Sequence, residues 1–318
     1  MWGRRGNTSR RSKGNDHYKL TSGKAVNLNR IVCMRNEIKR RSGNVQVIDA
    51  RIKSVKQHVR MLALSDLHFD NPKCNRKLLK QHLDQAIKSD AFICIFGDLF
   101  CAMEGFGDPR ASKSIRPEHM PAGGGAYLDL IVHEAVEWFQ PYKQHLFLVC
   151  PGNHETSVLK RHEIDLIDRF CTMMRAAGGV AISGGYGNFC KIRCDYQNNK
   201  LSDVIYSHHG YGGSGAWGRQ TNAFQKYLTQ CTADIYIAGH IHRKETFPHV
   251  QAYLDSKNRV KQRKIHFIRT GTYKDEFKDG ASGWANEKAM GARPMGGYWI
   301  EWYYQAKSWH RKIYETDS

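Results

Sequence analysis

Leu-Ala-Leu-Ser-Asp-Leu-His, at residues 62–68, is an apolar run followed at once by two side chains of types that bind metal ions. The apolar residues 61–64 predict a buried β-strand, because a strand covered on both faces is apolar throughout. Asp66 and His68 then lie just beyond the carboxyl end of that strand. Ligand sites of α/β sheets form at this edge, where side chains from several strands can meet. The stretch therefore predicts an α/β fold with a site at the strand ends.

Four more clusters of the same kind follow along the chain. They are Phe-Gly-Asp (96–98), Pro-Gly-Asn-His-Glu (151–155), Tyr-Ser-His-His-Gly (206–210) and Ala-Gly-His-Ile-His (238–242). Apolar runs at residues 92–96, 146–150 and 235–238 precede three of them and predict further buried strands. One such cluster arises often by chance, and a single core histidine is usually hydrogen-bonded rather than metal-bound. Five in series indicate one shared site.

The residue types in these clusters indicate the chemistry of the site. Carboxylate oxygens and imidazole nitrogens together suit Mn, Fe or Zn, and the lack of cysteine in the clusters argues against a closed structural zinc site. Asp98 stands alone in its cluster, and because a carboxylate can bridge two ions, we expect it to do so. Two ions about 3.5 to 4 Å apart can activate water and stabilise both oxygens of a phosphoryl transfer. The clusters therefore predict hydrolysis without a protein nucleophile.

In their order, the five clusters resemble the signature of the calcineurin-like metallophosphoesterase superfamily, and the resemblance extends to its phage and bacterial DNA-associated members. It covers roughly residues 61–273. It implies a metallophosphoesterase fold, in which a two-sheet β-sandwich is flanked by helices. It also implies a cofactor of two divalent metal ions, with Mn as the expected metal and Fe or Zn as alternatives.

The resemblance further implies roles for individual residues. The first ion would be held by Asp66, His68, Asp98 and His242, and the second by Asp98, Asn153, His208 and His240. His154 would act on the phosphate, as transition-state stabiliser or as proton donor to the leaving group. His208 is favoured as the ligand because it stands at the strand end, although a His-Gly pattern would favour His209. If His208 is the ligand, His209 is left as a candidate substrate-binding residue.

Apolar periodicity predicts how the rest of the chain folds. Residues repeating every three or four positions predict helices around 79–87, 131–138, 164–174 and 224–228. Beyond residue 242 the pattern predicts strands at 246–254, 264–269, 297–304 and 309–314. With 318 residues and 41% hydrophobic residues, the chain is long enough for one large catalytic domain, which we expect at residues 59–318.

Charge is concentrated at the amino end. Residues 1–60 hold 16 of the 49 Lys and Arg but 3 of the 30 acidic residues, so they carry 13 of the net charge of +19. We expect residues 1–58 to form a basic, partly flexible extension with short ordered pieces at 31–33 and 45–48. Basic arms often bind nucleic acid through its phosphates. The alternative is a solvated tail that aids solubility.

The expected location of the protein is the cytoplasm, or the host cytoplasm if a phage encodes it. No stretch has the apolar length of a membrane span, and Met-Trp-Gly-Arg-Arg at the amino end lacks the apolar run of a signal peptide. We therefore expect no membrane association. The nine cysteines have irregular spacings and read as reduced thiols.

Two loops are candidates for substrate binding. Residues 100–125 carry Arg110 and Arg116, and a loop of this length without periodicity is usually functional or mobile. Residues 210–219 carry Trp217 and Arg219, which could stack a base and hold its phosphate. Packing against the protein is the alternative role of Trp217.

Three functions are compatible with these features. A phosphodiesterase or nuclease acting on nucleic acid is favoured by the dinuclear site, the basic extension and the cationic loops. A phosphomonoesterase acting on phosphoprotein or a nucleotide would use the same metal site. A nucleic-acid-binding scaffold with an incidental hydrolase fold is disfavoured by the complete set of ligands. The sequence thus predicts a hydrolase of ester bonds, with nucleic acid as the expected partner.

Overall fold

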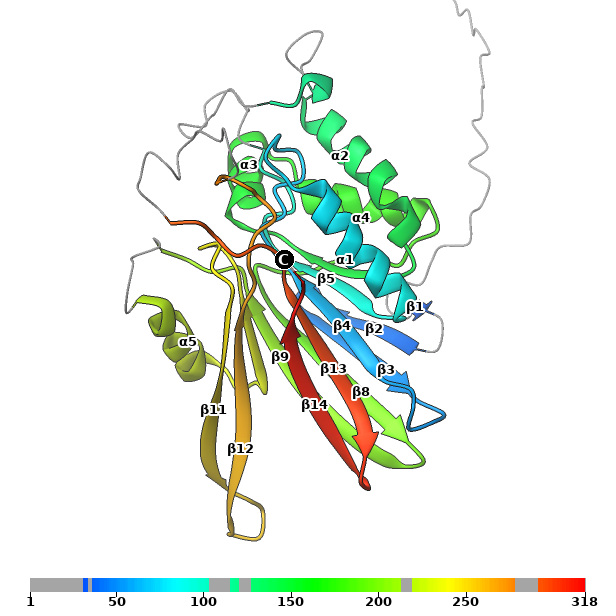
Figure 1. Cartoon of the computed structure of the whole chain (residues 1–318), viewed down its shortest axis with the longest axis vertical. Coiled ribbons are helices and arrows are strands. Elements are labelled where there is room, and N and C mark those ends of the chain that lie inside the picture. Colours follow the sequence, from blue (N-terminus) through cyan, green and yellow to red (C-terminus); the bar gives the residue numbers. More distant parts are fainter. Residues whose placement is uncertain are drawn as a thin grey trace, which may run out of the picture.

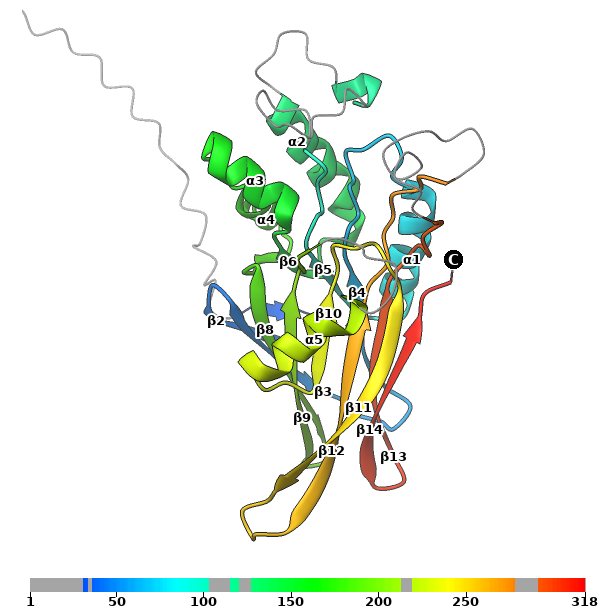
Figure 2. The ribbon, with the colours of Figure 1, turned by 90° about the vertical axis from the view of Figure 1, so that its left-hand side faces the viewer.

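The computed structural model describes residues 31–33, 36–102, 115–119, 127–212, 219–277 and 291–317. Two mixed β-sheets pack face to face, and helices cover their outer faces (Figures 1 and 2). The expected α/β fold with a two-sheet sandwich is therefore confirmed. Among the helices of these ranges, none has both the length and the apolarity that crossing a membrane requires.

One sheet has six strands in the order β14-β13-β4-β5-β6-β7. They are β4 (Val59–Leu64), β5 (Phe92–Phe96), β6 (Leu146–Cys150), β7 (Ile182–Ser183), β13 (Tyr298–Gln305) and β14 (Ser308–Glu315). The strands β4, β5 and β6 run parallel. They are the strands predicted before the first three clusters, and they are buried almost throughout because both faces of the sheet are covered.

The other sheet has eight strands in the order β1-β2-β3-β8-β9-β10-β12-β11. They are β1 (Ile31–Cys33), β2 (Asn36–Ser42), β3 (Val45–Arg51), β8 (Gly187–Tyr196), β9 (Asn199–His208), β10 (Ile235–Ala238), β11 (Glu245–Leu254) and β12 (Val260–Arg269). Neighbouring β9, β10 and β12 run parallel. The fourth and fifth clusters follow β9 and β10, so they lie at the same edge of this sheet.

Helices α1 (Arg76–Lys88), α2 (Tyr127–Phe139) and α4 (Leu166–Ala176) pack on the outer face of the six-stranded sheet (Figure 1). Helix α5 (Arg219–Gln230) packs on β10 and β12 of the other sheet (Figure 2). All four were predicted from apolar periodicity. Helix α3 (Asn153–His162) was not predicted, and it begins inside the third cluster. Two short 3₁₀ helices, Pro117–His119 and Gln140–Tyr142, complete the helical part.

The core between the sheets includes part of the basic amino-terminal segment. Ile48 and Ala50 of β3 are buried there, and β3 pairs in parallel with β8. The ordered pieces expected at 31–33 and 45–48 are thus strands β1 and β3 of the sheet. The division of the chain at residues 58 and 59 stays a prediction. Residues 1–30 lie outside the described ranges.

Candidate metal centre

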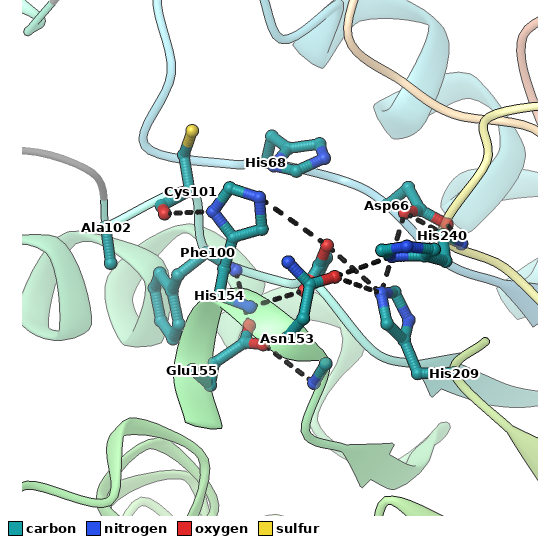
Figure 3. A network of polar contacts seen from close by, with 12 residues as sticks. Asp66, His68, Phe100, Cys101, Ala102, Asn153, His154, Glu155, His209 and His240 are labelled. Carbon is teal, nitrogen blue, oxygen red and sulfur yellow. Dashed lines mark hydrogen bonds and ion pairs between the residues drawn. The ribbon is translucent and has the colours of Figure 1, made fainter. Parts of the chain in front are cut away.

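The five clusters converge at the edge where β4, β5, β6, β9 and β10 end. Backbone hydrogen bonds join the loops that follow these strands. The N–H of Asp66 donates to the carbonyl of Gly97 at 3.0 Å, and that of His68 donates to the carbonyl of Asp98 at 3.1 Å. On the other sheet, the N–H of Gly239 donates to the carbonyl of His209 at 2.8 Å. These bonds hold the predicted side chains in one place (Figure 3).

The backbone of the clusters adopts an uncommon conformation. Five predicted ligands have a positive φ, which residues other than glycine rarely adopt. They are Asp66 (53°), His68 (46°), Asp98 (50°), His240 (75°) and His242 (56°). Strained backbone of this kind persists where the surrounding structure enforces it, most often at functional sites. Its concentration here supports a functional role for this edge of the sandwich.

Two glycines of the clusters are required for the close approach of these loops. A Cβ at Gly152 would lie 2.1 Å from Oδ1 of Asp98. A Cβ at Gly97 would lie 2.2 Å from Nδ1 of His209, and Gly97 also has a φ of +104°. Neither position can hold a larger residue without moving a predicted ligand or its neighbour. The glycines are therefore as much part of the clusters as the polar residues.

Asp66, His68 and His242 form the first group of side chains. One potential ligand atom from each lies within 4.8 Å of the others. Nε2 of His68 is 3.1 Å from Nε2 of His242, which is 3.3 Å from Oδ1 of Asp66. Burial, together with the nearby His154, lowers the pKa of His68 well below its usual value. The neutral imidazole that a metal ligand requires is thus the favoured form.

Asp98, His209 and His240 form the second group, with the same spacing limit of 4.8 Å. Nε2 of His209 is 3.1 Å from both Oδ2 of Asp98 and Oδ1 of Asn153. Nδ1 of His240 is 2.7 Å from the same oxygen of Asn153. The Asn153 amide oxygen therefore lies between the two histidines, as expected of a shared ligand set.

Hydrogen bonds to carbonyl groups orient both histidine rings. Nδ1 of His209 donates to the carbonyl of Phe96 at 3.1 Å, and Nε2 of His240 donates to that of Gly212 at 2.9 Å. In each ring the other nitrogen then faces Asn153. Histidines that bind metals are usually fixed in this way, because the second bond sets both the tautomer and the ring orientation.

The structure places the side chain of His209, rather than that of His208, among the predicted ligands. His208 was predicted as the ligand, but its Nδ1 accepts from the N–H of Gly210 at 3.1 Å and lies 3.2 Å from the hydroxyl of Tyr227. No candidate metal group within the described residues includes it. Successive side chains of a strand point to opposite faces, so β9 directs Ser207 inward and His208 toward α5. His209 takes the place in the cluster instead.

The two carboxylates and His209 shift one another's pKa values. Burial acts to raise the pKa of Asp66 and Asp98, but the adjacent His209 overcomes it and lowers both values, that of Asp98 well below its usual range. Conversely, burial acts to lower the pKa of His209, and the two carboxylates raise it to about 10. Two buried carboxylates this close require positive charge beside them. Oxygen and imidazole donors around such a charge fit a divalent Mn, Fe or Zn ion.

The ring of His154 is also oriented by a carbonyl group. Its Nδ1 donates to the carbonyl of Cys101 at 2.6 Å, and its N–H donates to Oδ1 of Asp98 at 3.1 Å (Figure 3). Nε2 is thereby left facing the centre, 3.8 Å from Oδ2 of Asp98. His154 does not belong to the second group. The geometry agrees with the predicted role as proton donor, which stays a prediction.

Glu155, which no sequence argument singled out, fixes the loops beneath the site. Its buried carboxylate accepts from the N–H groups of Gly152 and Phe100, both at 2.8 Å. Burial, together with the charge of Asp98, raises its pKa to about 8. It joins the second cluster to the third. Its position as an acidic residue in the first turn of α3 was the available signal.

The structure describes only some of the predicted substrate-binding residues. Arg110 and Trp217 lie outside the described residues, and Arg219 is the first residue of α5. The guanidinium of Arg116 donates to the carbonyl of Asn71 at 2.9 Å and lies 3.8 Å from Glu118. These contacts give Arg116 a role in holding its loop. Its role in substrate binding stays a prediction.

Comparisons with known proteins agree with this geometry. The family model described as calcineurin-like phosphoesterase matches residues 59–244. No curated protein matched the chain. Similar solved structures include GAP50, the anchor in the inner membrane complex of Plasmodium, at 13% identity and a TM-score of 0.39, covering 81% of this chain and 84% of that one. Vacuolar protein sorting 29 from Cryptosporidium parvum has 12% identity and a TM-score of 0.33, with coverage of 82% and 99%.

A metallophosphoesterase from Sphaerobacter thermophilus is similar at 12% identity and a TM-score of 0.36, with coverage of 81% of this chain and 89% of that one. The family match spans more than half of the chain and all five clusters. The chain therefore belongs to the calcineurin-like phosphoesterases, and it is a metal-dependent hydrolase of phosphoester bonds.

Proposed function

We propose that this hydrolase is a phosphodiesterase that acts on nucleic acid at a centre of two divalent ions, with Mn as the expected metal. The proposed ligands of the first ion are Asp66, His68, Asp98 and His242. Those of the second are Asp98, Asn153, His209 and His240. Asp98 is assigned to both sets because the family resemblance implies a bridging carboxylate here. Its Oδ2 lies 3.1 Å from Nε2 of His209 and 3.8 Å from Nε2 of His154.

Bound divalent ions would supply Lewis acidity, which polarises the phosphoryl group and activates water. The residues of the chain hold the reacting groups in position and transfer protons. Because Nδ1 of His154 donates a hydrogen bond to the Cys101 carbonyl, Nε2 is the ring atom that can transfer a proton to the leaving oxygen. Glu155 keeps the loops of Asp98 and His154 at a fixed separation. The arrangement suits a substrate whose leaving group is a poor one and needs protonation.

The observation that carries the choice of nucleic acid is a cationic groove on the outer face of the eight-stranded sheet. The groove has a volume of about 660 Å³, and four of its lining residues are basic and two acidic: Arg51, Lys191, Arg193 and Lys200, with Asp49 and Asp195. Arg193 pairs with Asp49 and Arg51 lies 3.5 Å from Asp195, whereas Lys191 and Lys200 are exposed and add two positive charges to the groove. The accessible charge is therefore positive, as a phosphate backbone requires.

The groove and the proposed centre lie at opposite ends of the same strands. His208 pairs with Gly187 near the centre, and Leu201 pairs with Cys194 at the groove. Seven residues separate these pairs, which amounts to about 24 Å at a rise of about 3.4 Å per residue. A polynucleotide several residues long could reach both, whereas a mononucleotide could not. With the basic segment before residue 31, this supports a polymeric substrate.

Parallel assays on defined substrates test the proposal. A phosphomonoester, a small phosphodiester, and single- and double-stranded DNA are offered with Mn²⁺ present and again after chelation. We expect metal-dependent cleavage of the diester and of DNA, with little cleavage of the monoester. Preferential cleavage of the monoester would replace the proposal with a phosphomonoesterase. DNA binding without cleavage of any substrate would instead indicate a scaffold.

A charge-reversal pair tests the groove. The variant Lys191→Glu with Lys200→Glu should raise the Michaelis constant for DNA and lower the salt slope of binding by about 0.9 for each lost phosphate contact on a duplex. Hydrolysis of a small diester should not change, because these residues are far from the centre. The matched control is Lys77→Glu with Lys307→Glu, which changes the net charge equally at exposed positions elsewhere. Equal effects of the two pairs would refute a specific groove.

Deletion of residues 1–30 tests the basic extension. It leaves β1, β2 and β3 in the chain, so the sheet keeps its strand order. We expect small-diester hydrolysis to persist and DNA binding to weaken with a flatter salt dependence. Unchanged DNA binding and cleavage would make this segment a solubility tail.

A further inference from the structure

The thiol of Cys101 lies beside the proposed centre but belongs to neither ligand set. Cys101 follows β5 and Asp98 in the second cluster loop, and it is buried. Its sulfur and one ring nitrogen each of His68 and His154 lie within 4.8 Å of one another. Figure 3 shows the sulfur on the same side of the site as these two rings. A thiol and two imidazoles at this spacing form a third potential ligand group.

A second observation comes from His68. The residue is 2% exposed, and its Nδ1 has no hydrogen-bond partner among the described residues. The rings of His154, His209 and His240 each donate to a carbonyl, whereas Nδ1 of His68 donates to none within the described ranges. A buried polar atom without a partner is costly, and a ring nitrogen opposite a metal-binding nitrogen normally has one. A ligand on this side of the ring would satisfy it.

We propose that Cys101, His68 and His154 form a third metal site, which takes a thiophilic divalent ion such as Zn²⁺ and whose occupation inhibits the enzyme. A thiolate with two imidazoles selects Zn²⁺ over Mn²⁺, because soft sulfur binds hard ions poorly. Three protein ligands suffice for zinc when water fills the fourth position. Binding forms one Zn–S and two Zn–N bonds. It breaks the S–H bond of Cys101 and, when Nε2 of His68 holds the first ion, the Nδ1–H bond of His68. Both protons leave to solvent, so no oxidant or reductant is involved.

Inhibition follows because the ion would bind Nε2 of His154. Nδ1 of His154 is committed to the Cys101 carbonyl, so an ion can reach this ring only through Nε2, the atom proposed to transfer a proton. An ion there removes that proton donor. Tetrahedral zinc with bonds of about 2.3 Å to sulfur and about 2.0 Å to nitrogen needs ligand atoms about 3.5 Å apart. Because the three atoms now lie within 4.8 Å of one another, the side chains close in by up to about 1.3 Å. Inhibition rests on the proposed function, whereas binding at this site does not.

Cobalt titration of the full chain tests binding without an activity assay. Co²⁺ bound to a thiolate gives an intense sulfur-to-cobalt absorption in the near ultraviolet, which oxygen and nitrogen ligands do not produce. The unchanged chain should show this band, and Cys101→Ser should abolish it while keeping the weaker visible bands of the other cobalt sites. Cys231→Ser is the matched control, because Cys231 lies partly exposed beyond α5 and its variant should keep the band.

A missing band in the unchanged chain, or a band that survives in Cys101→Ser, would overturn the third site and leave the dinuclear centre standing. The inhibition is measured with the Mn²⁺-loaded enzyme and a small phosphodiester under added Zn²⁺. Cys101→Ser should keep the turnover with Mn²⁺ and raise the inhibitory zinc concentration at least about tenfold. Cys231→Ser should leave it unchanged. Equal zinc sensitivity of Cys101→Ser and the unchanged chain would refute inhibition through this site.

Discussion

Replacing His209 and His208 one at a time tests the proposed assignment of His209 as the metal ligand. Loss of a residue that only supports a ligand typically lowers metal affinity 10- to 100-fold, so loss of a direct ligand should lower it at least about 100-fold. His209→Ala removes a buried nitrogen 3.1 Å from both Asp98 and Asn153. His208→Ala removes contacts with Gly210 and Tyr227 on the other face of β9 and should leave metal affinity nearly unchanged.

The gain in folding stability on adding metal measures this difference and is independent of any loss of stability in the variants themselves. At a metal concentration of about 100 times the dissociation constant, the unchanged chain and His208→Ala should each gain about 2.7 kcal/mol. A 100-fold weaker site gains about 0.4 kcal/mol at the same concentration. Thermal or urea unfolding with and without Mn²⁺ gives both values. If His209→Ala gained the full 2.7 kcal/mol on adding Mn²⁺ and His208→Ala gained only about 0.4 kcal/mol, the assignment would be refuted.

Three further outcomes are expected. Asp98→Asn should reduce the metal content of both sites and abolish hydrolysis, because this carboxylate contributes to both ligand sets; unchanged metal content by elemental analysis would contradict the bridge. His154→Ala should keep its metals and lose about 10²- to 10⁴-fold in turnover, most on substrates with poor leaving groups; a parallel fall in metal content would make it a ligand. Burial acts to raise the pKa of Glu301, but bonds from His58 and Arg60 lower it overall. Glu301→Gln should therefore cost about 1 kcal/mol at pH 7, and the difference should shrink as the pH falls below 4.5, the usual pKa of the group; unfolding at both pH values measures it.

The sequence was sufficient for the strands that carry the clusters. Each predicted strand before a cluster is apolar because both faces of its sheet are covered, and that physical cause is visible in the residues themselves. The convergence of the clusters could also be predicted, since parallel strands end at a common edge. Helix α3 could not, because its apolar face is short and its first residues serve the site.

His208 was favoured as the ligand from its position along the chain, without regard to the alternation of side chains along the strand. β9 has a buried position at Ile205 and another at Ser207, and this pattern carries on to His209. Because every second side chain of a strand faces the same side, the buried positions Ile205 and Ser207 predict that His209 also points inward. Glu155 carried a sequence signal only as an acidic residue at a helix start, and its bonds to Gly152 and Phe100 exist only in the folded loops. That Nδ1 of His68 lacks a partner among the described residues likewise becomes evident only in the folded structure.

The most direct test of the dinuclear centre is an anomalous difference map from crystals of the full chain grown or soaked with Mn²⁺. The account predicts two peaks about 3.5 to 4 Å apart. One should lie among Asp66, His68 and His242, the other among Asn153, His209 and His240, with Asp98 in contact with both. A single peak, no peak, or a second peak bound to His208 would contradict it.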